Sequence, residues 1–377
     1  MKNKKKIVMI GPVYPYKGGI SHYTGLMYRA LAEEHDVTMI SYKLQYPKLL
    51  YKKEQKDFSN DTFKIDNTNF LIHTANPFNW FHSAKEIKNL NPDLIIIQWW
   101  HPYFSPCYWT LCNFLKNYKK LFICHNVFPH ERFPMDRFLT KRVLSNGDYF
   151  IVQSQQDEAD LKSIKPNAVY QRTVHPTYNA FKIKDLSKVE GRQLLNIGES
   201  EQVLLFFGFV REYKGLKYLL HSLPQVTAKL NRIKLLVVGD FDGDKEVYTT
   251  LIHDLNMDSY IEIHDGYIPD LEVEKFFAAS DLVVLPYESA TQSGIVQIAY
   301  GFEKPVIVTD VGGLPEVVLD NQTGYVVEAK NSDALASAII RFFEEQKSED
   351  FKTAIQQEAT RYSWSRMADT IYNLTEH

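Results

Sequence analysis

The sequence predicts an α/β protein with two doubly wound domains, each a parallel sheet covered by helices on both faces. Three observations lead to this prediction. Short apolar runs of strand length recur along the chain with helical patterns between most of them, and such alternation is typical of parallel sheets. The chain has 377 residues, more than a single hydrophobic core usually serves. A polar stretch at residues 182–201 interrupts the alternation.

The first series of elements begins at residues 6–11, KIVMIG, an apolar strand that leads into a loop rich in glycine and proline. A helix is expected from about Ser21 to Glu34. The connection at residues 43–66 is basic and aromatic and has no clear period, which indicates an irregular excursion on the substrate side. The remaining strands of this series are expected at 36–41, 69–73, 93–98, 120–124 and 148–152.

The second series follows the polar stretch, which carries Gly191 and Gly198. We therefore expect domains at 1–180 and 181–360, with a last helix at 361–377 that could pack on either domain. Ligands of doubly wound sheets bind outside the carboxyl ends of the strands, so a site in the cleft between the domains is expected. The strands are expected at 203–207, 233–239, 260–263, 281–285, 305–308 and 324–327, with helices such as 215–230 and 331–346.

The composition is that of a globular protein, with 45% hydrophobic and 24% charged residues. No segment approaches the ~20 apolar residues that a membrane span needs, and the start, MKNKKKIVMIG, lacks the pattern of a signal peptide. A cytosolic protein is expected. Cys107, Cys112 and Cys124 form no CxxC pair, and this fits reduced, unpaired thiols.

The net charge of −3 hides an asymmetry between the two halves. Residues 1–175 contain 24 Lys and Arg against 15 Asp and Glu, whereas residues 176–377 contain 19 against 31. A basic first half could attract an anionic membrane surface, a lipid phosphate or a nucleic acid. Basic tails such as residues 2–6 could equally serve only to keep the chain soluble.

The stretch at residues 202–216, QVLLFFGFVREYKGL, carries the first candidate site. Its apolar run stops at Gly208, and Arg211 and Lys214 follow before Gly215 opens a helical pattern. Two cations beside a helix N-terminus suit a diphosphate, because the free N–H groups and the cations both favour negative charge. The alternative is that both cations are solvated surface charges.

The segment at residues 281–318 has a similar organisation. A buried strand ends at Pro286, Glu288 follows in a loop, and Ser293 and Gly294 begin a helix. This offers a carboxylate for sugar or ribose hydroxyls beside a helix start that can hold a phosphate. With a further glycine-rich turn at 311–314 and the cations of the preceding stretch, a phosphate-bearing ligand is the most economical interpretation.

The loop GPVYPYKGGI, after the first strand, contains Gly18 and Gly19. Glycine lets the backbone approach a ligand closely and offer N–H groups to an anion, although a plain strand-to-helix turn would look the same. The spacing matches neither GxGxxG nor GxxxxGK[ST]. A nicotinamide dinucleotide enzyme and a P-loop NTPase are therefore disfavoured.

Two further groups of polar residues follow strand ends. His125 ends the strand LFIC, where it could do proton or hydrogen-bond work or could merely hold the loop; His130 is a weaker candidate of the same kind. Asp240, Asp242 and Asp244 alternate in a loop that lacks the glycine and glutamate of a calcium hand. A solvated acidic loop is favoured there over a metal site.

Taken together, these segments resemble family 4 of the nucleotide-sugar glycosyltransferases, whose members have the GT-B fold of two Rossmann-like domains. The resemblance covers nearly the whole chain in family order and is not specific for one sugar. It rests on GPVYPYKGGI, QWWHPYFSP, FICHNVFPHE, IVQSQQDEADL, HPTYNAF, FFGFVREYKGL, VVGDF, SATQSGIVQIAYGFEKPVI, TDVGGLPEVV and YSWSRMA.

The resemblance implies roles for individual residues. Arg211 and Lys214 correspond to the cations that hold the donor diphosphate, and His125 matches a histidine beside the transferred sugar. With Glu288 they form the expected catalytic set. One departure matters: Glu288 leads to Val296 where members carry a second glutamate, and Gln297 is the nearest polar side chain. The residues expected to bind the donor are Gly18, Gly19, Gly208, Tyr267, Ile268, Ser293, Gly294 and Gln297.

The resemblance further implies a retaining, hexosyltransferase-type enzyme (EC 2.4) that uses a UDP- or GDP-sugar without an obligatory metal or other cofactor. The expected acceptor is a glycan or a polyprenyl-diphosphate-linked sugar of cell-surface polysaccharide or glycolipid synthesis. That acceptor would bring the protein into peripheral contact with the anionic inner membrane face; no nucleic-acid partner is expected. The alternatives are another two-domain sugar enzyme, such as an epimerase or phosphorylase, and a catalytically inactive sugar-nucleotide-binding scaffold of a polysaccharide assembly complex.

Overall fold

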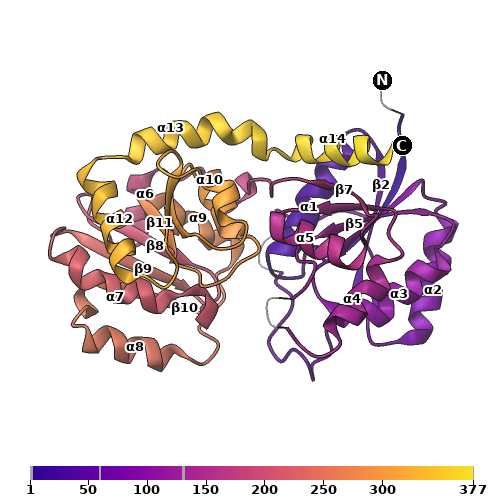
Figure 1. The fold of residues 1–377 in the computed structure, drawn as a ribbon, viewed down its shortest axis with the longest axis horizontal. Helices are drawn as coiled ribbons and strands as arrows, with labels where there is room; N and C mark the ends of the chain where they lie inside the picture. Colours follow the sequence, from indigo (N-terminus) through magenta and orange to yellow (C-terminus); the bar gives the residue numbers. More distant parts are fainter. Residues whose placement is uncertain (1–2, 59–60, 130–131, 377) are drawn as a thin grey trace. The chain divides into compact units, whose positions relative to one another are not determined.

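The computed structural model describes residues 3–58, 61–129 and 132–376. The chain forms two compact units, each around its own parallel sheet (Figure 1). Unit 1 consists of residues 1–174 together with 363–377, and unit 2 consists of residues 175–362. The prediction of two parallel-sheet domains with helices is confirmed.

The sheet of unit 1 has the strand order β3-β2-β1-β4-β5-β6-β7, and its neighbouring strands are parallel. The strands in its centre consist mostly of buried apolar residues because helices cover both of their faces. The strand order reverses between β1 and β4, so the carboxyl ends of these two strands mark a topological switch point. The strands are β1 (Lys6–Ile10), β2 (Asp36–Leu44), β3 (Asn69–His73), β4 (Leu94–Trp99), β5 (Lys119–Cys124), β6 (Tyr149–Val152) and β7 (Val169–Arg172).

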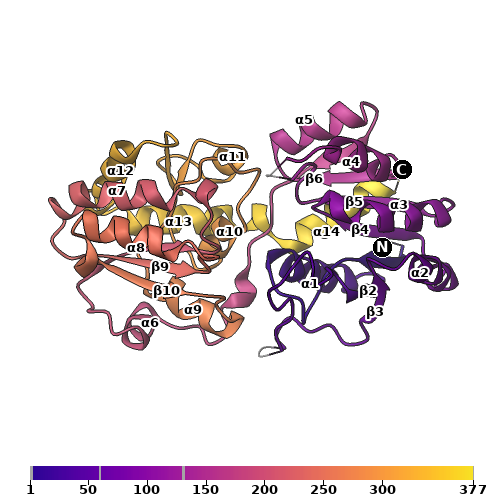
Figure 2. The ribbon, with the colours of Figure 1, turned by 90° about the horizontal axis from the view of Figure 1, so that it is seen from below.

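The helices of unit 1 divide between the faces of this sheet. α1 (Gly19–Ala32) packs against α14 (Trp364–Thr375), the last helix of the chain (Figure 2). The rings of Tyr23 and Trp364 meet there at 5.0 Å. The apolar core of the other face includes residues of α2 (Pro77–Asn89), α3 (Ser105–Phe114), α4 (Asp136–Leu144) and α5 (Gln155–Ile164).

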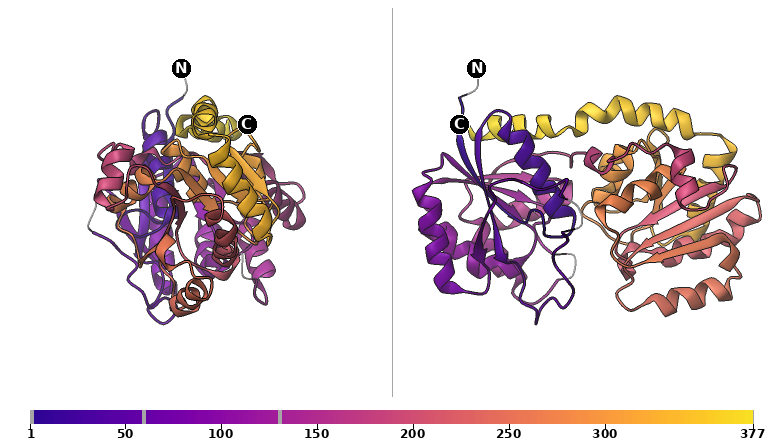
Figure 3. Two further views of the ribbon diagram at one scale, coloured as in Figure 1. Left: turned by 90° about the vertical axis from the view of Figure 1, so that its left-hand side faces the viewer. Right: turned by 180° about the vertical axis from the view of Figure 1, so that it is seen from behind.

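The sheet of unit 2 has the order β10-β9-β8-β11-β12-β13 and is again parallel. Its strands lie side by side when seen from behind (Figure 3). The order reverses between β8 and β11, which gives unit 2 its own switch point. The strands are β8 (Gln202–Phe207), β9 (Ile233–Gly239), β10 (Ile261–Asp265), β11 (Leu282–Leu285), β12 (Val306–Thr309) and β13 (Gly324–Val327).

The helices of unit 2 also pack on one another. α7 contacts α12, and α6 contacts α9. α6 lies within the polar stretch 182–201, which the structure places in unit 2. A Cβ on Gly191 of α6 would lie only 2.8 Å from the backbone nitrogen of Ala279, so glycine allows this close packing. The helices are α6 (Lys188–Leu194), α7 (Leu216–Thr227), α8 (Lys245–Asp254), α9 (Asp270–Ala279), α10 (Gly294–Gly301), α11 (Leu314–Val317), α12 (Ser332–Glu344) and α13 (Ser348–Glu358).

The predicted strands are found within a few residues of their expected bounds. The edge strand β7 was not predicted, because its residues are mostly exposed and form no apolar run. α1 begins at Gly19, two residues before its expected start. In the described part of residues 45–66 the structure has neither helix nor strand, apart from an isolated bridge between Tyr16 and Lys56.

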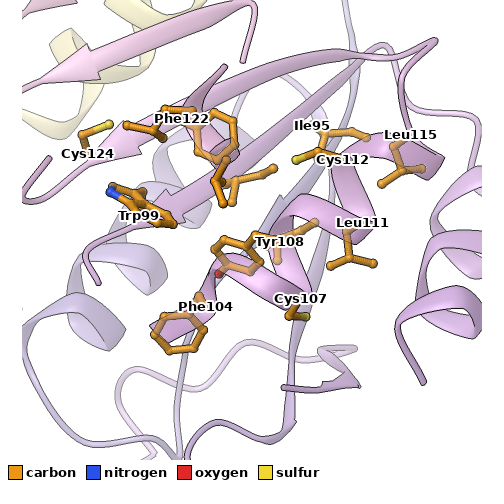
Figure 4. Close-up of a cluster of buried hydrophobic side chains, with 14 of the residues drawn as sticks. Ile95, Trp99, Phe104, Cys107, Tyr108, Leu111, Cys112, Leu115, Phe122 and Cys124 are labelled. Atoms are coloured by element: carbon orange, nitrogen blue, oxygen red, sulfur yellow. The ribbon is translucent and has the colours of Figure 1, made fainter. Parts of the chain in front are cut away.

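The three cysteines are buried and unpaired, as expected (Figure 4). Across the described residues, no helix combines the length and apolar character needed to cross a lipid bilayer.

Candidate functional site

Three glycines close the carboxyl edge of the sheet in unit 2. Gly208, Gly239 and Gly266 end or follow β8, β9 and β10, and all three have positive φ. The N–H of Gly208 donates to Val238 O at 2.9 Å, and the N–H of Gly266 donates to Gly239 O at 3.2 Å. A Cβ on Gly239 would lie 1.9 Å from the carbonyl oxygen of Gly208. The three strand ends are therefore in backbone contact. At Gly239 this contact leaves no room for a Cβ, and glycine adopts the positive φ of all three positions readily.

Lys214 is the most distinctive cation at this edge. It ends a short 3₁₀ helix, η3 (Glu212–Lys214), and its side chain is half-buried. Its Nζ lies 3.1 Å from the position that a Cβ on Gly208 would take, and 5.4 Å from the centroid of the Tyr287 ring. Burial lowers the pKa of Lys214. Among the described residues, no carboxylate lies within ion-pair distance of this ammonium, which leaves it available to an anion.

Arg211, the second predicted cation, differs from Lys214 in its exposure and in its ion pairing. It is exposed and forms an ion pair with Asp242. The N–H of Asp242 donates to Oδ1 of Asp240 at 2.8 Å. The carboxylates of the acidic loop thus contact the loop's own backbone and the Arg211 guanidinium. Within the described ranges, no cluster of three or more residues could ligate a metal ion. An incoming diphosphate would have to compete with Asp242 for Arg211.

The start of α10 lies beside Gly208. A Cβ on Gly208 would be 3.6 Å from Cδ1 of Ile295, in the first turn of this helix. Ser293 occupies the N-cap position, but its side chain caps no backbone N–H; its Oγ lies 3.4 Å from the hydroxyl of Tyr287. The first-turn N–H groups are thus not occupied by a capping side chain. The structure thus brings Gly208, Lys214, Ser293 and Gly294 together where β8 and β11 end.

A glycine turn fixes the loop before α10. Gly312 has φ 52°, and a Cβ there would lie 1.5 Å from the carbonyl oxygen of Ala290. The N–H of Gly313 donates to Thr291 O at 3.0 Å. The glycine-rich turn after β12 therefore supports the loop that presents Ser293, which gives it a positioning role.

Gln297 lies in α10 with only 1% of its surface exposed. Its backbone oxygen accepts from the N–H of Tyr178 at 3.3 Å. Its side-chain Oε1 is buried and has no hydrogen-bond partner among the described residues. An unpaired buried carbonyl costs about 1–3 kcal/mol, so this oxygen could accept a hydrogen bond from a ligand or a water.

Glu288 is held by two lysines that sequence reasoning did not identify. Its two carboxylate oxygens pair at 3.0 Å with Nζ of Lys217, in α7, and with Nζ of Lys330, after β13. Partial burial acts to raise the pKa of Glu288, but the two ammonium groups outweigh burial and lower it. The carboxylate thus links its own loop to the first turn of α7 and to the loop after β13. Lys217 stands near Lys214 in the sequence, whereas no sequence signal points to Lys330.

Tyr267 and Ile268 follow Gly266 at the end of β10 and are half-buried. The backbone contacts of Gly208, Gly239 and Gly266 place them along the same edge of the sheet as the cations.

In unit 1, Gly18 and Gly19 lie at the start of α1. Gly18 has φ 104° and is the N-cap residue, and as a glycine it has no side chain with which to cap the helix. A Cβ on either glycine would meet no atom within 4 Å. The space that a Cβ would occupy is open at both positions, so packing does not require glycine there.

His125 directly follows β5 and is 9% exposed. Its backbone N–H donates to Trp99 O at 2.8 Å, its Nε2 lies 2.8 Å from Oε1 of Gln98, and its ring meets that of Tyr23 edge-on at 4.6 Å. The hydroxyl of Tyr23 accepts from Nε2 of Gln153 at 2.9 Å. Sequence reasoning missed Gln98, Tyr23 and Gln153, because each comes from a separate element. His130 lies outside the described residues.

Two family models match the chain. The model described as "Glycosyltransferase Family 4" matches residues 17–177, and the model described as "Glycosyl transferases group 1" matches residues 201–345. One match lies almost entirely in unit 1 and the other lies in unit 2.

Curated relatives agree with these models. The D-inositol 3-phosphate glycosyltransferase of Mycobacteroides abscessus is 27% identical over 236 residues, covering 61% of this chain and 52% of the relative. The lipopolysaccharide 1,2-N-acetylglucosaminetransferase of Salmonella typhimurium is 31% identical over 186 residues, covering 47% of this chain and 49% of the relative. The chain thus spans about half the length of the curated relatives it matches.

Solved structures share the fold over nearly the whole chain. Sucrose-phosphate synthase from Thermosynechococcus elongatus has a TM-score of 0.76 at 19% identity and covers 99% of this chain and 98% of that one. Anabaena HepE in complex with UDP-glucose has a TM-score of 0.74 at 17% identity and covers 99% of this chain and 100% of that one.

Proposed function

Because this chain belongs to family 4 of the glycosyltransferases and has their GT-B fold, we propose that it transfers a hexosyl group from a nucleotide-diphosphate sugar to a hydroxyl of a glycan or lipid-linked acceptor. One observation carries the proposal. Lys214, half-buried and without a carboxylate partner among the described residues, lies beside Gly208 and the uncapped start of α10. A cation and free backbone N–H groups at a switch point suit a diphosphate.

A UDP- or GDP-sugar is the proposed donor. Anabaena HepE was solved with UDP and with UDP-glucose, which supports a nucleotide sugar for a chain of the same fold. In unit 2, Gly208, Ser293, Gly294 and Lys214 would hold the diphosphate, and the backbone at Tyr267 and Ile268 would contact the nucleobase. Gln297 would offer its unpaired Oε1 to a donor hydroxyl in place of the second glutamate of the family.

Transfer breaks the bond between the anomeric carbon and the diphosphate, so negative charge grows on the leaving group. The Lys214 ammonium and the first-turn amides of α10 would stabilise that charge as it forms. Only binding that strengthens in the transition state speeds the reaction. Arg211 would add a second cation once it exchanges Asp242 for phosphate.

The remaining roles follow from the family resemblance. We take the reaction to retain anomeric configuration, with the donor phosphate accepting the proton of the acceptor hydroxyl and no obligatory metal or other cofactor. His125 would hydrogen-bond the transferred sugar and would not act as a nucleophile. The backbone at Gly18 and Gly19 would approach the donor. Glu288, ion-paired on both oxygens, would act on the sugar directly or by holding the loops that shape the donor site.

The acceptor is proposed to be a glycan or a polyprenyl-diphosphate-linked sugar of cell-surface polysaccharide or glycolipid synthesis. The match to a lipopolysaccharide N-acetylglucosaminetransferase supports this class. A lipid-linked acceptor would bring the chain to the cytoplasmic membrane face, where the basic first half would be attracted.

A panel of nucleotide sugars tests the proposal. A donor that binds should raise the melting temperature, because ligands that bind only the folded state stabilise it. The same donor should then glycosylate a lipid-linked acceptor pool, and full activity should persist in excess EDTA. Stabilisation without transfer to any acceptor would favour the inactive scaffold, and the lack of stabilisation by every donor would reject nucleotide-sugar binding.

A further inference from the structure

The segment through which the chain enters unit 2 lies along one side of α10. Tyr178 is 2% exposed, and its N–H donates to the carbonyl oxygen of Gln297 at 3.3 Å. A Cβ on Gly294 would lie 3.7 Å from Cε2 of the Tyr178 ring, and a Cβ on Gly301 would lie 3.0 Å from the Tyr178 carbonyl oxygen. Tyr178 therefore meets α10 at its first residue, in its middle and at its last residue.

These three contacts lie on one face of the helix. Residues three and four apart are neighbours on a helix surface, and Gly294, Gln297 and Gly301 have this spacing. The contact at Gly301 leaves little room for a side chain, because its Cβ would also lie 3.2 Å from Oδ1 of Asn179. Glycine at the end of α10 thus lets the backbone of Tyr178 approach the helix closely.

The Tyr178 ring is held in place by His175. Nδ1 of His175 lies 2.9 Å from the carbonyl oxygen of Pro176, which can only accept, so this nitrogen carries the proton. Burial lowers the pKa of His175 to about 4, so the imidazole is neutral at neutral pH. Its Nε2 then accepts a hydrogen bond from the Tyr178 hydroxyl at 3.2 Å. This bond orients the ring that lies beside Gly294.

The segment through which the chain leaves unit 2 reaches the same helix. Tyr362 is the last residue of unit 2, and its carbonyl oxygen accepts from the N–H of Thr177 at 2.9 Å. The ring centroid of Tyr362 lies 5.9 Å from that of Tyr300, in α10, and its hydroxyl donates to Val317 O at 3.1 Å. The entering and leaving segments are thus bonded to each other and packed on α10, which restrains Tyr178 further.

We propose that Tyr178 is a positioning residue for the donor diphosphate and acts through α10. Its ring fixes the first turn of the helix, and its N–H fixes the turn that carries Gln297, so the first-turn N–H groups keep the positions that the diphosphate requires. The inference rests on the proposed function, in which Ser293 and Gly294 hold the diphosphate. Small displacements matter, because a shift of about 1 Å can cost about a hundredfold in rate.

Calorimetry with UDP and UMP, and with GDP and GMP, tests this role. The nucleoside diphosphate carries the distal phosphate that the start of α10 would hold, and the monophosphate lacks it. Tyr178→Leu removes the ring and keeps the backbone N–H. It should weaken diphosphate binding about tenfold to a hundredfold, as for one lost charge-assisted hydrogen bond, and should change monophosphate binding by at most about twofold. General destabilisation would not change the ratio of the two dissociation constants.

Two further variants disturb the same contacts more mildly. Tyr178→Phe keeps the ring and loses only the hydroxyl, so its diphosphate binding should stay within about threefold of the wild type. Gly301→Ala acts from the side of α10, because its Cβ would press on the Tyr178 carbonyl oxygen. It should weaken diphosphate binding about threefold or more and leave monophosphate binding unchanged. Gly301→Ala tests the inference even where Tyr178→Leu fails to fold.

Tyr325→Leu is the matched control. Tyr325, in β13, is 3% exposed, and its ring meets that of Phe351 at 5.2 Å. Among the described residues, the buried members of its core cluster include none of α10. The variant should lose stability, as Tyr178→Leu does, and keep the wild-type ratio of dissociation constants.

The outcomes separate this inference from the proposed function. A wild type that binds none of these nucleotides would reject both together. Nucleotide binding by the wild type, with an unchanged ratio in Gly301→Ala and in folded Tyr178→Leu, would reject the positioning role alone. An equal change of the ratio in Tyr325→Leu would also reject it.

Discussion

The two units have different polar side chains at equivalent positions of their similar sheets. Each strand order reverses beside the first strand of the unit, at β1 and β4 in unit 1 and at β8 and β11 in unit 2. At the carboxyl edge of unit 1, His125 is held by Gln98 and Tyr23, which are neutral. At that of unit 2, Lys214 lies beside glycine backbone and a helix start.

The difference shows that topology provides the place for a ligand and side chains decide its charge. At both edges the N-cap residue of a helix gives no side-chain cap, Gly18 at α1 and Ser293 at α10. Beside the start of α10 lies Lys214, a cation that has no carboxylate within ion-pair distance among the described residues. An anion should therefore prefer unit 2, although the two sheets are built alike.

The largest expected effect is on stability, when glycines at the carboxyl edges of the two sheets are replaced by alanine. Gly215 has φ 67°, and a Cβ there would lie 1.9 Å from Pro286 O, whereas a Cβ on Gly18 would meet nothing within 4 Å. Gly215→Ala should cost more than about 3 kcal/mol, because strain adds to a backbone clash. Gly18→Ala should cost only about 1–2 kcal/mol, the price of positive φ.

Urea unfolding separates these effects, because all five tryptophans lie in unit 1. Tryptophan fluorescence therefore reports on unit 1, and far-ultraviolet circular dichroism reports on both units. Gly215→Ala should shift the dichroism transition and leave the fluorescence transition nearly in place. Equal destabilisation by the two substitutions would contradict the packing argument.

The next effect is the loss of the Lys214 cation. Lys214→Ala should lower kcat/KM about tenfold to a hundredfold, since a charge-assisted hydrogen bond is worth about 1.5–3 kcal/mol. The exposed Lys229→Ala variant is the matched control and should keep wild-type activity. Steady-state kinetics with the donor from the panel provides the measurement; near-wild-type transfer by Lys214→Ala would rule out the assigned role.

A smaller effect is expected in unit 1. His125→Asn should lower kcat about twofold to tenfold, because the loss of one neutral hydrogen bond costs about 0.5–1.5 kcal/mol. Donor affinity, measured by calorimetry, should stay within about twofold if unit 2 supplies most of the diphosphate contacts. A large loss of donor affinity in this variant would show that the anion preference is not confined to unit 2.

The smallest effect concerns pH. Burial lowers the pKa of Lys214, so raising the pH removes its proton earlier than for an exposed lysine and should weaken donor binding. The dissociation constant should rise about twofold where half of the Lys214 groups are neutral. Lys214→Arg should remain charged and flatten this profile. Calorimetry from neutral to alkaline pH measures the donor dissociation constant of the wild type and of Lys214→Arg. Identical pH profiles of the two proteins would contradict the role of Lys214 in donor binding.

Much of the fold was predictable because apolar runs are continuous where strands are covered on both faces. β4 and β8 are examples. The edge strand β7 was missed because its exposed residues have no such run. Helix α6 was missed because the polar character of residues 182–201 hid it, although its Gly191 packs closely on α9.

The sequence by itself determined the two parallel sheets and the candidate residues at their carboxyl edges, because strand ends and glycine turns are local signals. Only the tertiary structure decided which charges are compensated. It paired Arg211 with Asp242 and Glu288 with Lys217 and Lys330, and it left Lys214 half-buried without a carboxylate among the described residues. The physical reason is that charge compensation depends on distances between residues far apart in the chain, which no local pattern contains.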